Sequence, residues 1–277
     1  MKRKIIFLDI DGTLTEPGKN EPPQSALKAI RQARENGHLV YLCSGRNYGM
    51  LSPLLAYPFD GVIASSGGYI LCGNQVIYDN PVTKAQQEKA VRLLEENGVF
   101  YTIECRDGSF TDSGFKEFLA AHAAEGANSE LLRWRRQLES TLNIRPLEEY
   151  EGQPVYKIVV MSPTLKQLDQ PREVLKEDFS FCIQEPDQYG FVNGEMVSRA
   201  FDKGKGVKRV CCYLGIGLED SIAFGDSMND LEMLETAGFG VCMENGSSQL
   251  KHLADDICPS VSEDGLYRAF LKYQLIN

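Results

Sequence analysis

The sequence has no apolar run long enough to cross a membrane, no excess of basic residues and few histidines. Without a long apolar run, we expect no transmembrane segment and no membrane partner. The formal net charge is −10, from 29 basic and 39 acidic residues. This balance argues against a nucleic-acid partner, because nucleic-acid-binding proteins present basic surfaces. It does not argue against an anionic substrate, since a local site can be positive on an acidic protein.

The cysteines also lack a pattern. None of the eight forms a Cys-x-x-Cys pair, and most lie inside apolar segments, which favours free buried thiols in a reducing compartment over zinc ligands or disulfides. Three of the first four residues are basic, as in a signal peptide. The apolar run that follows has only four residues before Asp9, too few for a secretory signal. We therefore expect a cytoplasmic protein, either a monomer or a small homo-oligomer.

What the sequence does contain is a repeated alternation of buried strands and helices. Short apolar runs typical of strands buried on both faces occur at residues 5–8, 39–43, 61–64, 222–224 and 239–243. Amphipathic segments predict helices at residues 26–36, 204–214, 230–237, 247–254 and 265–275. Strands joined through helices by short links indicate a parallel sheet.

The alternation is interrupted in the middle of the chain. A hairpin is expected around Gly73-Asn74, and mixed helices and hairpin-type strands fill residues 83–187, including a predicted helix at Phe115–Ala124. The sequence therefore predicts an α/β protein: a Rossmann-like doubly wound parallel sheet core, residues 1–82 and 188–277, with an inserted α+β domain at 83–187. The basic cluster Arg133–Arg136 is typical of a solvated helix face, and His38, His122 and His252 are expected to be surface or packing residues.

Polar side chains follow several of the predicted strands. Asp9 and Asp11 end the first strand, Ser44-Gly45-Arg46 follows the second, and Gly225-Asp226 opens a polar turn that runs to Asp230. Lys203-Gly204 stands just before a helix. Because the carboxyl ends of parallel strands share one edge of a sheet, these loops can meet. They would supply carboxylates for a cation, and a hydroxyl, a lysine and helix N-termini for an anion.

Each of these features has an ordinary structural explanation when it is taken alone. Asp and Gly are common where a strand turns, Ser before Gly is usually a turn, and a lone lysine such as Lys203 is more often a solvated charge. Their joint occurrence, each at an expected strand end, favours a site for phosphate and magnesium.

These motifs resemble those of haloacid dehalogenase superfamily phosphatases, in the Cof-type branch with a large α/β cap. The four motifs are Asp9-x-Asp11-Gly12-Thr13, Ser44-Gly45-Arg46, Lys203-Gly204 and Gly225-Asp226-Ser227-Met228-Asn229-Asp230, and their order and the place of the insertion also match. The resemblance implies a phosphatase that uses Mg²⁺ to hydrolyse a small phosphorylated metabolite, such as a sugar phosphate. It further implies that residues 83–187 form the cap that sets substrate specificity.

The resemblance also implies roles for single residues. Asp9 would be the nucleophile that becomes an aspartyl-phosphate, and Asp11 the general acid and then base. Asp9, the backbone carbonyl of Asp11, and Asp226 would hold the metal, with Asp230 orienting the site. Phosphate or substrate would contact the remaining motif residues: Gly12, Ser44, Gly45, Arg46, Lys203 and Asn229. Lys205 is a weaker alternative to Lys203, because the family spacing favours Lys203.

One position departs from the family pattern: Ser66-Gly67 stands where the family often has Asn-Gly. We expect this difference to affect substrate contacts and not the chemistry. Two alternatives to hydrolysis stay open at this stage, namely a phosphomutase or phosphotransferase of the same superfamily and a non-catalytic sensor of phosphorylated ligands. A receiver domain is disfavoured, because it would be about half this length.

Overall fold

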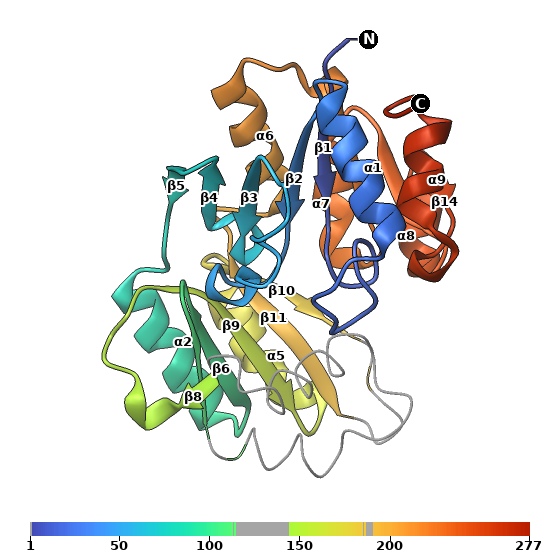
Figure 1. Ribbon diagram of the computed structural model, residues 1–277. Helices are drawn as coiled ribbons and strands as arrows, with labels where there is room; N and C mark the ends of the chain where they lie inside the picture. The colour runs from blue at the N-terminus through green and yellow to red at the C-terminus, as the bar shows by residue number, and fades with distance from the viewer. Residues whose placement is uncertain (1, 113, 115–143, 185, 187–190) are drawn as a thin grey trace. The chain divides into compact units, whose positions relative to one another are not determined.

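The structure is a computed structural model, and it describes residues 2–112, 114, 144–184, 186 and 191–277. The chain divides into two compact units (Figure 1). The core unit comprises Met1–Arg46, Leu51–Asp79 and Phe201–Asn277, and the inserted unit comprises Asn47–Met50 and Asn80–Ala200. The predicted helix at 115–124, His122 and the basic cluster at 133–136 lie outside the described residues.

The core unit is built on a sheet in the order β14-β13-β12-β1-β2-β3-β4-β5. Six strands pair in parallel: β1 (Ile5–Leu8), β2 (Leu39–Cys43), β3 (Gly61–Ala64), β12 (Ser221–Gly225), β13 (Gly240–Met243) and β14 (Asp256–Cys258). The hairpin β4 (Tyr69–Cys72) and β5 (Gln75–Asp79) adds an antiparallel edge. The α/β fold class is confirmed. β1 lies near the middle of the sheet, with strands on both sides, and all four of its apolar residues are buried.

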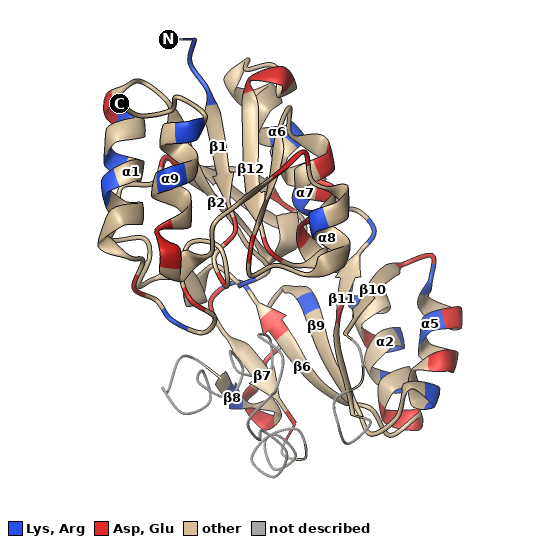
Figure 2. Cartoon of the chain, turned by 90° about the vertical axis from the view of Figure 1, so that its right-hand side faces the viewer, with Lys and Arg blue, Asp and Glu red and all other residues tan. Residues whose placement is uncertain are grey.

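Helices cover both faces of the core sheet, as Figure 2 shows. On one face lie α1 (Gln24–Glu35) and α9 (Gly265–Lys272); on the other lie α6 (Lys203–Leu214), α7 (Leu231–Thr236) and α8 (Ser248–Leu253). Alternate residues of β1 point to opposite faces, so Ile5 and Phe7 pack with Val207 of α6 and Met233 of α7. The sheet is therefore doubly wound, as the sequence predicted.

The inserted unit has a second sheet in the order β10-β11-β9-β6-β7-β8. Its strands are β6 (Phe100–Cys105), β7 (Ser109–Thr111), β8 (Ile144–Pro146), β9 (Val155–Ser162), β10 (Phe179–Ile183) and β11 (Val192–Ser198). Apolar residues of α2 (Lys84–Glu96) and of the short α5 (Asp169–Leu175) form its hydrophobic core with the sheet, for example Leu94, Ile158 and Leu175.

The inserted unit extends further along the chain than the span 83–187 that the sequence suggested. It reaches Ala200 because β11 lies between β10 and β9 in its sheet and is not part of the core. Gly194 and Glu195 interrupt the apolar pattern of β11, so no strand was expected there. Glu195 can nevertheless be buried, because its carboxylate pairs with Lys157 of β9 at 2.5 Å.

Short 3₁₀ turns occur at Gly49–Leu51, Ser65–Gly67, Leu147–Glu149, Leu165–Leu168, Leu218–Asp220, Met228–Asp230 and Val261–Glu263. All eight cysteines lie within the described residues and are free, and five of them are buried. Among the helices that the structure describes, none combines the length and the apolar character needed to cross a membrane.

Candidate active site

The predicted site residues follow three neighbouring strands of the core sheet. β1 pairs in parallel with β12 on one side and with β2 on the other. Asp9 follows β1, Ser44 follows β2 and Asp226 follows β12, so all three lie at the same edge. The backbone continues the pairing beyond β1, since Asp9 N donates to the carbonyl oxygen of Phe224 at 3.0 Å. The sheet therefore brings the predicted loops together.

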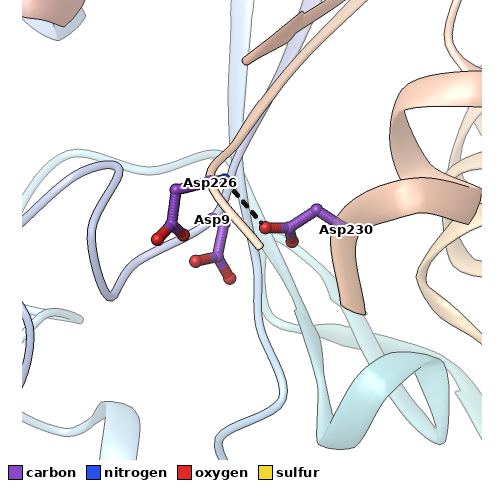
Figure 3. A group of neighbouring side chains, drawn as sticks. All are labelled: Asp9, Asp226 and Asp230. Atoms are coloured by element: carbon purple, nitrogen blue, oxygen red, sulfur yellow. Dashed lines mark hydrogen bonds between the residues drawn. The ribbon is translucent and has the colours of Figure 1, made fainter. Parts of the chain in front are cut away.

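Three buried carboxylates meet at this edge. Oxygen atoms of Asp9, Asp226 and Asp230 lie within 4.8 Å of one another, as Figure 3 shows. Asp230 is fully buried, and Asp9 and Asp226 are 5% and 7% exposed. Asp230 Oδ2 accepts from the backbone N–H groups of Asp226 at 3.0 Å and Ser227 at 3.2 Å, which ties it to the turn after β12.

Lys203 provides the positive charge inside this acidic group. Its Nζ donates to Asp9 Oδ1 at 2.7 Å and to Asp230 Oδ1 at 2.5 Å, and the residue is 1% exposed. Lys203 is the first residue of α6, and Gly204 lets α6 approach α7, because a Cβ there would lie 2.3 Å from the carbonyl oxygen of Glu232. The exposed Lys205 forms an ion pair with Asp202 instead.

The charges of this group do not balance without a cation. Three carboxylates and one ammonium give −3 + 1 = −2 in a buried site. Burial raises the pKa of Asp9 to about 7 and that of Asp226 well above its usual range, with the charge of Asp230 acting in the same direction. Burial alone would lower the pKa of Lys203, but the charges of Asp230 and Asp9 outweigh it and raise that pKa.

These residues fit a divalent cation. Asp226 Oδ1 is buried and accepts no hydrogen bond from the described residues, a costly arrangement for a carboxylate unless an ion compensates it. Hard cations such as Mg²⁺ take carboxylate oxygens as ligands. Both oxygens of Asp230 already accept hydrogen bonds from Lys203 and the backbone. Asp9 and Asp226 are therefore the side chains that could hold the ion.

Asp11 lies outside this acidic group, because its carboxylate is bound by Arg46. Arg46 Nε donates to Asp11 Oδ2 at 2.8 Å and Nη2 donates to Oδ1 at 2.7 Å, a bidentate pair. Gly18 N also donates to Asp11 Oδ1 at 2.9 Å, and Arg46 Nη1 donates to Asn20 Oδ1 at 2.6 Å. The guanidinium is 2% exposed, so this arrangement fixes the direction of the Asp11 side chain.

The structure thus gives Arg46 a partner that the sequence did not suggest. We expected Arg46 to bind phosphate or substrate, and that role stays a prediction. The same holds for the backbone carbonyl of Asp11 as a metal ligand. Asn20, which accepts from Arg46, was missed, because it sits in a polar loop without any periodic pattern that would single it out.

Glycine and asparagine hold the loop after β1 in place. Gly12 has a φ of 88°, and a Cβ there would lie 2.3 Å from Asp226 Oδ2, so only glycine fits beside that carboxylate. Asn245 Nδ2 donates to the carbonyl oxygen of Gly12 at 2.7 Å. Asn245 follows β13, the strand next to β12, and was not predicted. Its only sequence signal is its place after a strand of the same sheet.

The remaining predicted residues lie in the loops of the same edge. Ser44 is buried, and its Oγ accepts from the backbone N–H of Arg46 at 3.1 Å, which shapes the turn through Gly45. Ser227 Oγ donates to Asn229 Oδ1 at 2.7 Å, so Asn229 is held within the turn after β12. Thr13 Oγ1 is buried and has no hydrogen-bond partner among the described residues.

Comparison with known proteins identifies the family. The sequence profile described as haloacid dehalogenase-like hydrolase matches residues 6–270. The chain belongs to the haloacid dehalogenase-like hydrolases. A solved structure of a haloacid dehalogenase-like hydrolase from Bacillus subtilis superimposes with a TM-score of 0.80 at 25% identity, covering 98% of this chain and 99% of that one.

The names of two relatives of this chain give two different substrates. The 5-amino-6-(5-phospho-D-ribitylamino)uracil phosphatase YwtE of Bacillus subtilis is 26% identical, over 99% of this chain and 98% of its own. The pyridoxal phosphate phosphatase YbhA of Escherichia coli is also 26% identical, over 96% and 97%. Both names describe phosphatases of small phosphorylated compounds, but the two compounds are chemically different.

Proposed function

We propose that this protein is a Mg²⁺-dependent phosphatase that hydrolyses a phosphomonoester of a small metabolite through an aspartyl-phosphate on Asp9. The observation that carries the proposal is the buried group of Asp9, Asp226, Asp230 and Lys203, with its net charge of −2, at the carboxyl edge of the sheet. Membership of a hydrolase family and the phosphatase names of its relatives support the same reaction.

In the first step, an oxygen of the Asp9 carboxylate attacks phosphorus, and the bond from phosphorus to the leaving oxygen breaks. Asp11 in its protonated form gives the proton to that leaving oxygen. Lys203 keeps one Asp9 oxygen engaged at 2.7 Å, which orients the carboxylate for attack. The Ser44 hydroxyl donates a hydrogen bond to a phosphoryl oxygen, and the Lys203 ammonium binds another and offsets its charge, because phosphoryl transfer depends chiefly on positioning and charge stabilisation.

In the second step, water attacks the phosphorus of the aspartyl-phosphate. Asp11, now a carboxylate, takes the proton of the water, and the bond from phosphorus to the Asp9 oxygen breaks. Phosphate leaves, and Asp9 returns as a carboxylate. Arg46 and Gly18 engage both oxygens of Asp11, so each proton transfer requires the Asp11–Arg46 pair to open and free one carboxyl oxygen for the reacting group.

When bound by Asp9 and Asp226, Mg²⁺ would neutralise the charge that builds up between the carboxylates and the phosphoryl group. The residues fit this ion because Asp226 Oδ1 is a buried oxygen with no partner among the described residues. We further propose that the inserted unit selects the substrate and that the protein works in the cytoplasm. The eight free cysteines agree with a reducing compartment.

The direct test is hydrolysis of an aryl phosphate with three proteins: wild type, Asp9→Asn, and Asp169→Asn as a control in the inserted unit, where the residue is exposed. Turnover should stop when a chelator is added and return with Mg²⁺. Turnover by Asp9→Asn should be lower by about 10⁴-fold or more, as expected when a nucleophile is lost. This variant should also give no phosphorylated protein after an acid quench. Asp169→Asn should behave as wild type.

Undiminished turnover after exhaustive chelation would overturn the metal assignment, and phosphate trapped on a residue other than Asp9 would overturn the nucleophile. A phosphotransferase is distinguished by its product. With a sugar phosphate in water, the phosphatase releases inorganic phosphate, whereas a mutase returns the phosphoryl group to the sugar. A protein that binds phosphorylated ligands without turnover would be a sensor.

A further inference from the structure

Three loops meet beside the candidate metal ligands, and one of them supplies no ligand of its own. Residues 9–12 follow β1, Asp226 follows β12, and residues 244–247 lie between β13 and α8. β13 pairs in parallel with β12, so residues 244–247 leave the sheet at the same edge as Asp226. We call residues 244–247 the β13 loop.

The β13 loop is hydrogen-bonded to both of the loops that carry the candidate ligands. Asn245 Nδ2 donates to the carbonyl oxygen of Gly12 at 2.7 Å. The backbone N–H of Ser247 donates to the carbonyl oxygen of Asp226 at 2.8 Å. Gly246 allows this approach, because a Cβ there would lie 2.7 Å from the same carbonyl oxygen. Residues 245–247 therefore form a bridge from Gly12 to Asp226.

The bridge is itself fixed to the core sheet. Glu244 N donates to the carbonyl oxygen of Cys258, the last residue of β14, at 2.8 Å. Asn245 Oδ1 accepts from the backbone N–H of Val261 at 3.4 Å. Because a backbone N–H can only donate, this contact places the oxygen of the amide toward Val261 and its NH₂ group toward Gly12.

The spacing that the bridge controls matters for the metal. Asp9 and Asp226 lie on separate loops with their carboxylate oxygens close together (Figure 3), and their negative charges repel each other. The register of β1 with β12 ends at Leu8 and Phe224, and Asp9 N adds one more bond to Phe224. The β13 loop supplies further bonds past this point.

The two common divalent cations differ in how strictly they depend on such spacing. Mg²⁺ requires a nearly octahedral set of oxygens at about 2.0–2.1 Å, whereas Ca²⁺ accepts longer distances and a more variable geometry. If the two loops could move apart, the site should therefore lose affinity for Mg²⁺ more than for Ca²⁺.

We propose that Asn245 is a positioning residue for the metal. By holding the carbonyl group of Gly12, it fixes the spacing of Asp9 and Asp226 and favours Mg²⁺ over Ca²⁺. In this role, Asn245 binds neither the ion nor the substrate and acts through the loop after β1. The inference rests on the proposed function, because it takes Asp9 and Asp226 as the metal ligands.

The test measures the Kd of Mg²⁺ and of Ca²⁺ by isothermal titration calorimetry on the full-length protein, as wild type, Asn245→Ala and Asn36→Ala. Asn36 is the matched control, because its Nδ2 donates to the backbone carbonyl oxygen of Leu275 at 3.0 Å, at the end of α1. In Asn245→Ala, the Kd of Mg²⁺ should rise by about 10–100-fold, the usual effect of losing a contact that orients metal ligands. The Kd of Ca²⁺ should rise by a smaller factor. Asn36→Ala should bind both ions as wild type does.

Thermal melts separate metal binding from general stability. Each variant loses one side-chain hydrogen bond to a backbone carbonyl, so without metal the two should lose a similar amount of Tm. Added Mg²⁺ should raise Tm less in Asn245→Ala than in Asn36→Ala, because the weaker site is less occupied at the same concentration.

Three results would overturn the inference and leave the proposed function in place: an unchanged Kd of Mg²⁺ in Asn245→Ala, an equal rise in Asn36→Ala, or the same factor for Mg²⁺ and Ca²⁺. A wild-type protein that binds no Mg²⁺ would contradict the proposed function itself, and this inference with it.

Discussion

Each of the two units contains a buried lysine that lies between two carboxylates, but the two groups are built differently. In the core unit, Lys203 contacts Asp9 and Asp230 on loops that follow strands, and a third carboxylate, Asp226, lies beside them. The net charge is −2, and Asp226 keeps a buried oxygen without a partner among the described residues. Such an excess of buried negative charge is costly unless a cation binds.

In the inserted unit, the lysine and its partners lie within strands. Lys157 of β9 pairs with Glu195 of β11 at 2.5 Å and with Glu104 of β6 at 3.2 Å, and both neighbouring strands are hydrogen-bonded to β9. Glu104 stands opposite Lys157 in the register. The comparison teaches that a buried lysine between carboxylates does not by itself indicate catalysis. The group in the inserted unit also carries excess negative charge, +1 − 2 = −1. The larger excess of −2 and the position after the strand ends distinguish the core group.

After the loss of the nucleophile Asp9, the largest expected effect concerns Asp11, whose carboxylate is paired with Arg46. In Asp11→Asn, the nucleophile remains but proton transfer is lost, so turnover of an alkyl phosphate should fall by about 10²–10⁴-fold. With an activated aryl phosphate, the first step should survive better than the second. The aspartyl-phosphate should then accumulate on Asp9, and mass spectrometry after an acid quench measures it.

Arg46→Lys provides the matched comparison for Asp11. A lysine keeps the positive charge but cannot bind both carboxylate oxygens in the fork geometry of Arg46. If Arg46 positions Asp11, Arg46→Lys should slow the alkyl phosphate more than the aryl phosphate, as Asp11→Asn does. Wild-type turnover of an alkyl phosphate by Asp11→Asn would contradict the proton-transfer role.

Replacing each buried lysine in turn tests whether the two charged groups have different roles. Lys203→Met should lower turnover by about 10²–10³-fold, as loss of one electrostatic contact in an active site does. Lys157→Met should instead lower the free energy of unfolding by about 3–5 kcal/mol, because two buried glutamates lose their partner. Folded Lys157→Met should keep turnover close to wild type. Urea denaturation and aryl phosphate hydrolysis give the two measurements.

A control for Lys157 replaces the whole group. Changing Lys157 to Met together with Glu104 and Glu195 to Leu removes the stranded charges, and buried ion groups replaced in this way are often neutral in stability. Stability should therefore recover toward wild type in the triple variant. If Lys157→Met leaves stability unchanged and raises KM instead, the inserted unit's charged group binds substrate and the contrast with the core group fails.

A smaller effect links pH to the metal. Burial raises the pKa of Asp9 to about 7 in the metal-free protein, and that of Asp226 is raised in the same direction. A folded-state pKa above the unfolded one favours folding at low pH, and this contribution is lost as pH rises from about 4 toward 7. Mg²⁺ should therefore raise Tm more at pH 8 than at about pH 5. At a hundredfold excess over Kd, a bound ion adds about 2.7 kcal/mol to the free energy of unfolding, and we expect this full stabilisation only at the higher pH. Equal shifts at both values, measured by thermal melts with Mg²⁺ and with chelator, would contradict this.

The sequence predicts a part of the fold or of the site when the residues that determine it are neighbours in the chain, and fails when they are far apart. Asp9, Ser44 and Asp226 were placeable because parallel strands put their carboxyl ends at one edge, and four apolar residues before Asp9 define such a strand. The ion pair between Asp11 and Arg46 was not predictable, because the direction of the Asp11 side chain depends on the conformation of the polar loop that follows it. β11 was missed for a related reason: Glu195 looks exposed until Lys157 is known to be its partner.

The smallest expected effect concerns Ser66, which departs from the family's usual asparagine. Ser66 is buried, and its backbone has φ 55° and ψ 29°, in the left-handed region. Residues other than glycine adopt this region at a cost, and asparagine tolerates it better than serine. Ser66→Asn should therefore raise the free energy of unfolding by about 0.5–1 kcal/mol. Ser260→Asn is the control, because Ser260 has φ −65° before the 3₁₀ turn Val261–Glu263, where serine and asparagine are both good capping residues. If Ser66→Asn destabilises the protein while the control does not, space around the buried side chain and not backbone strain decides which residue stands at position 66.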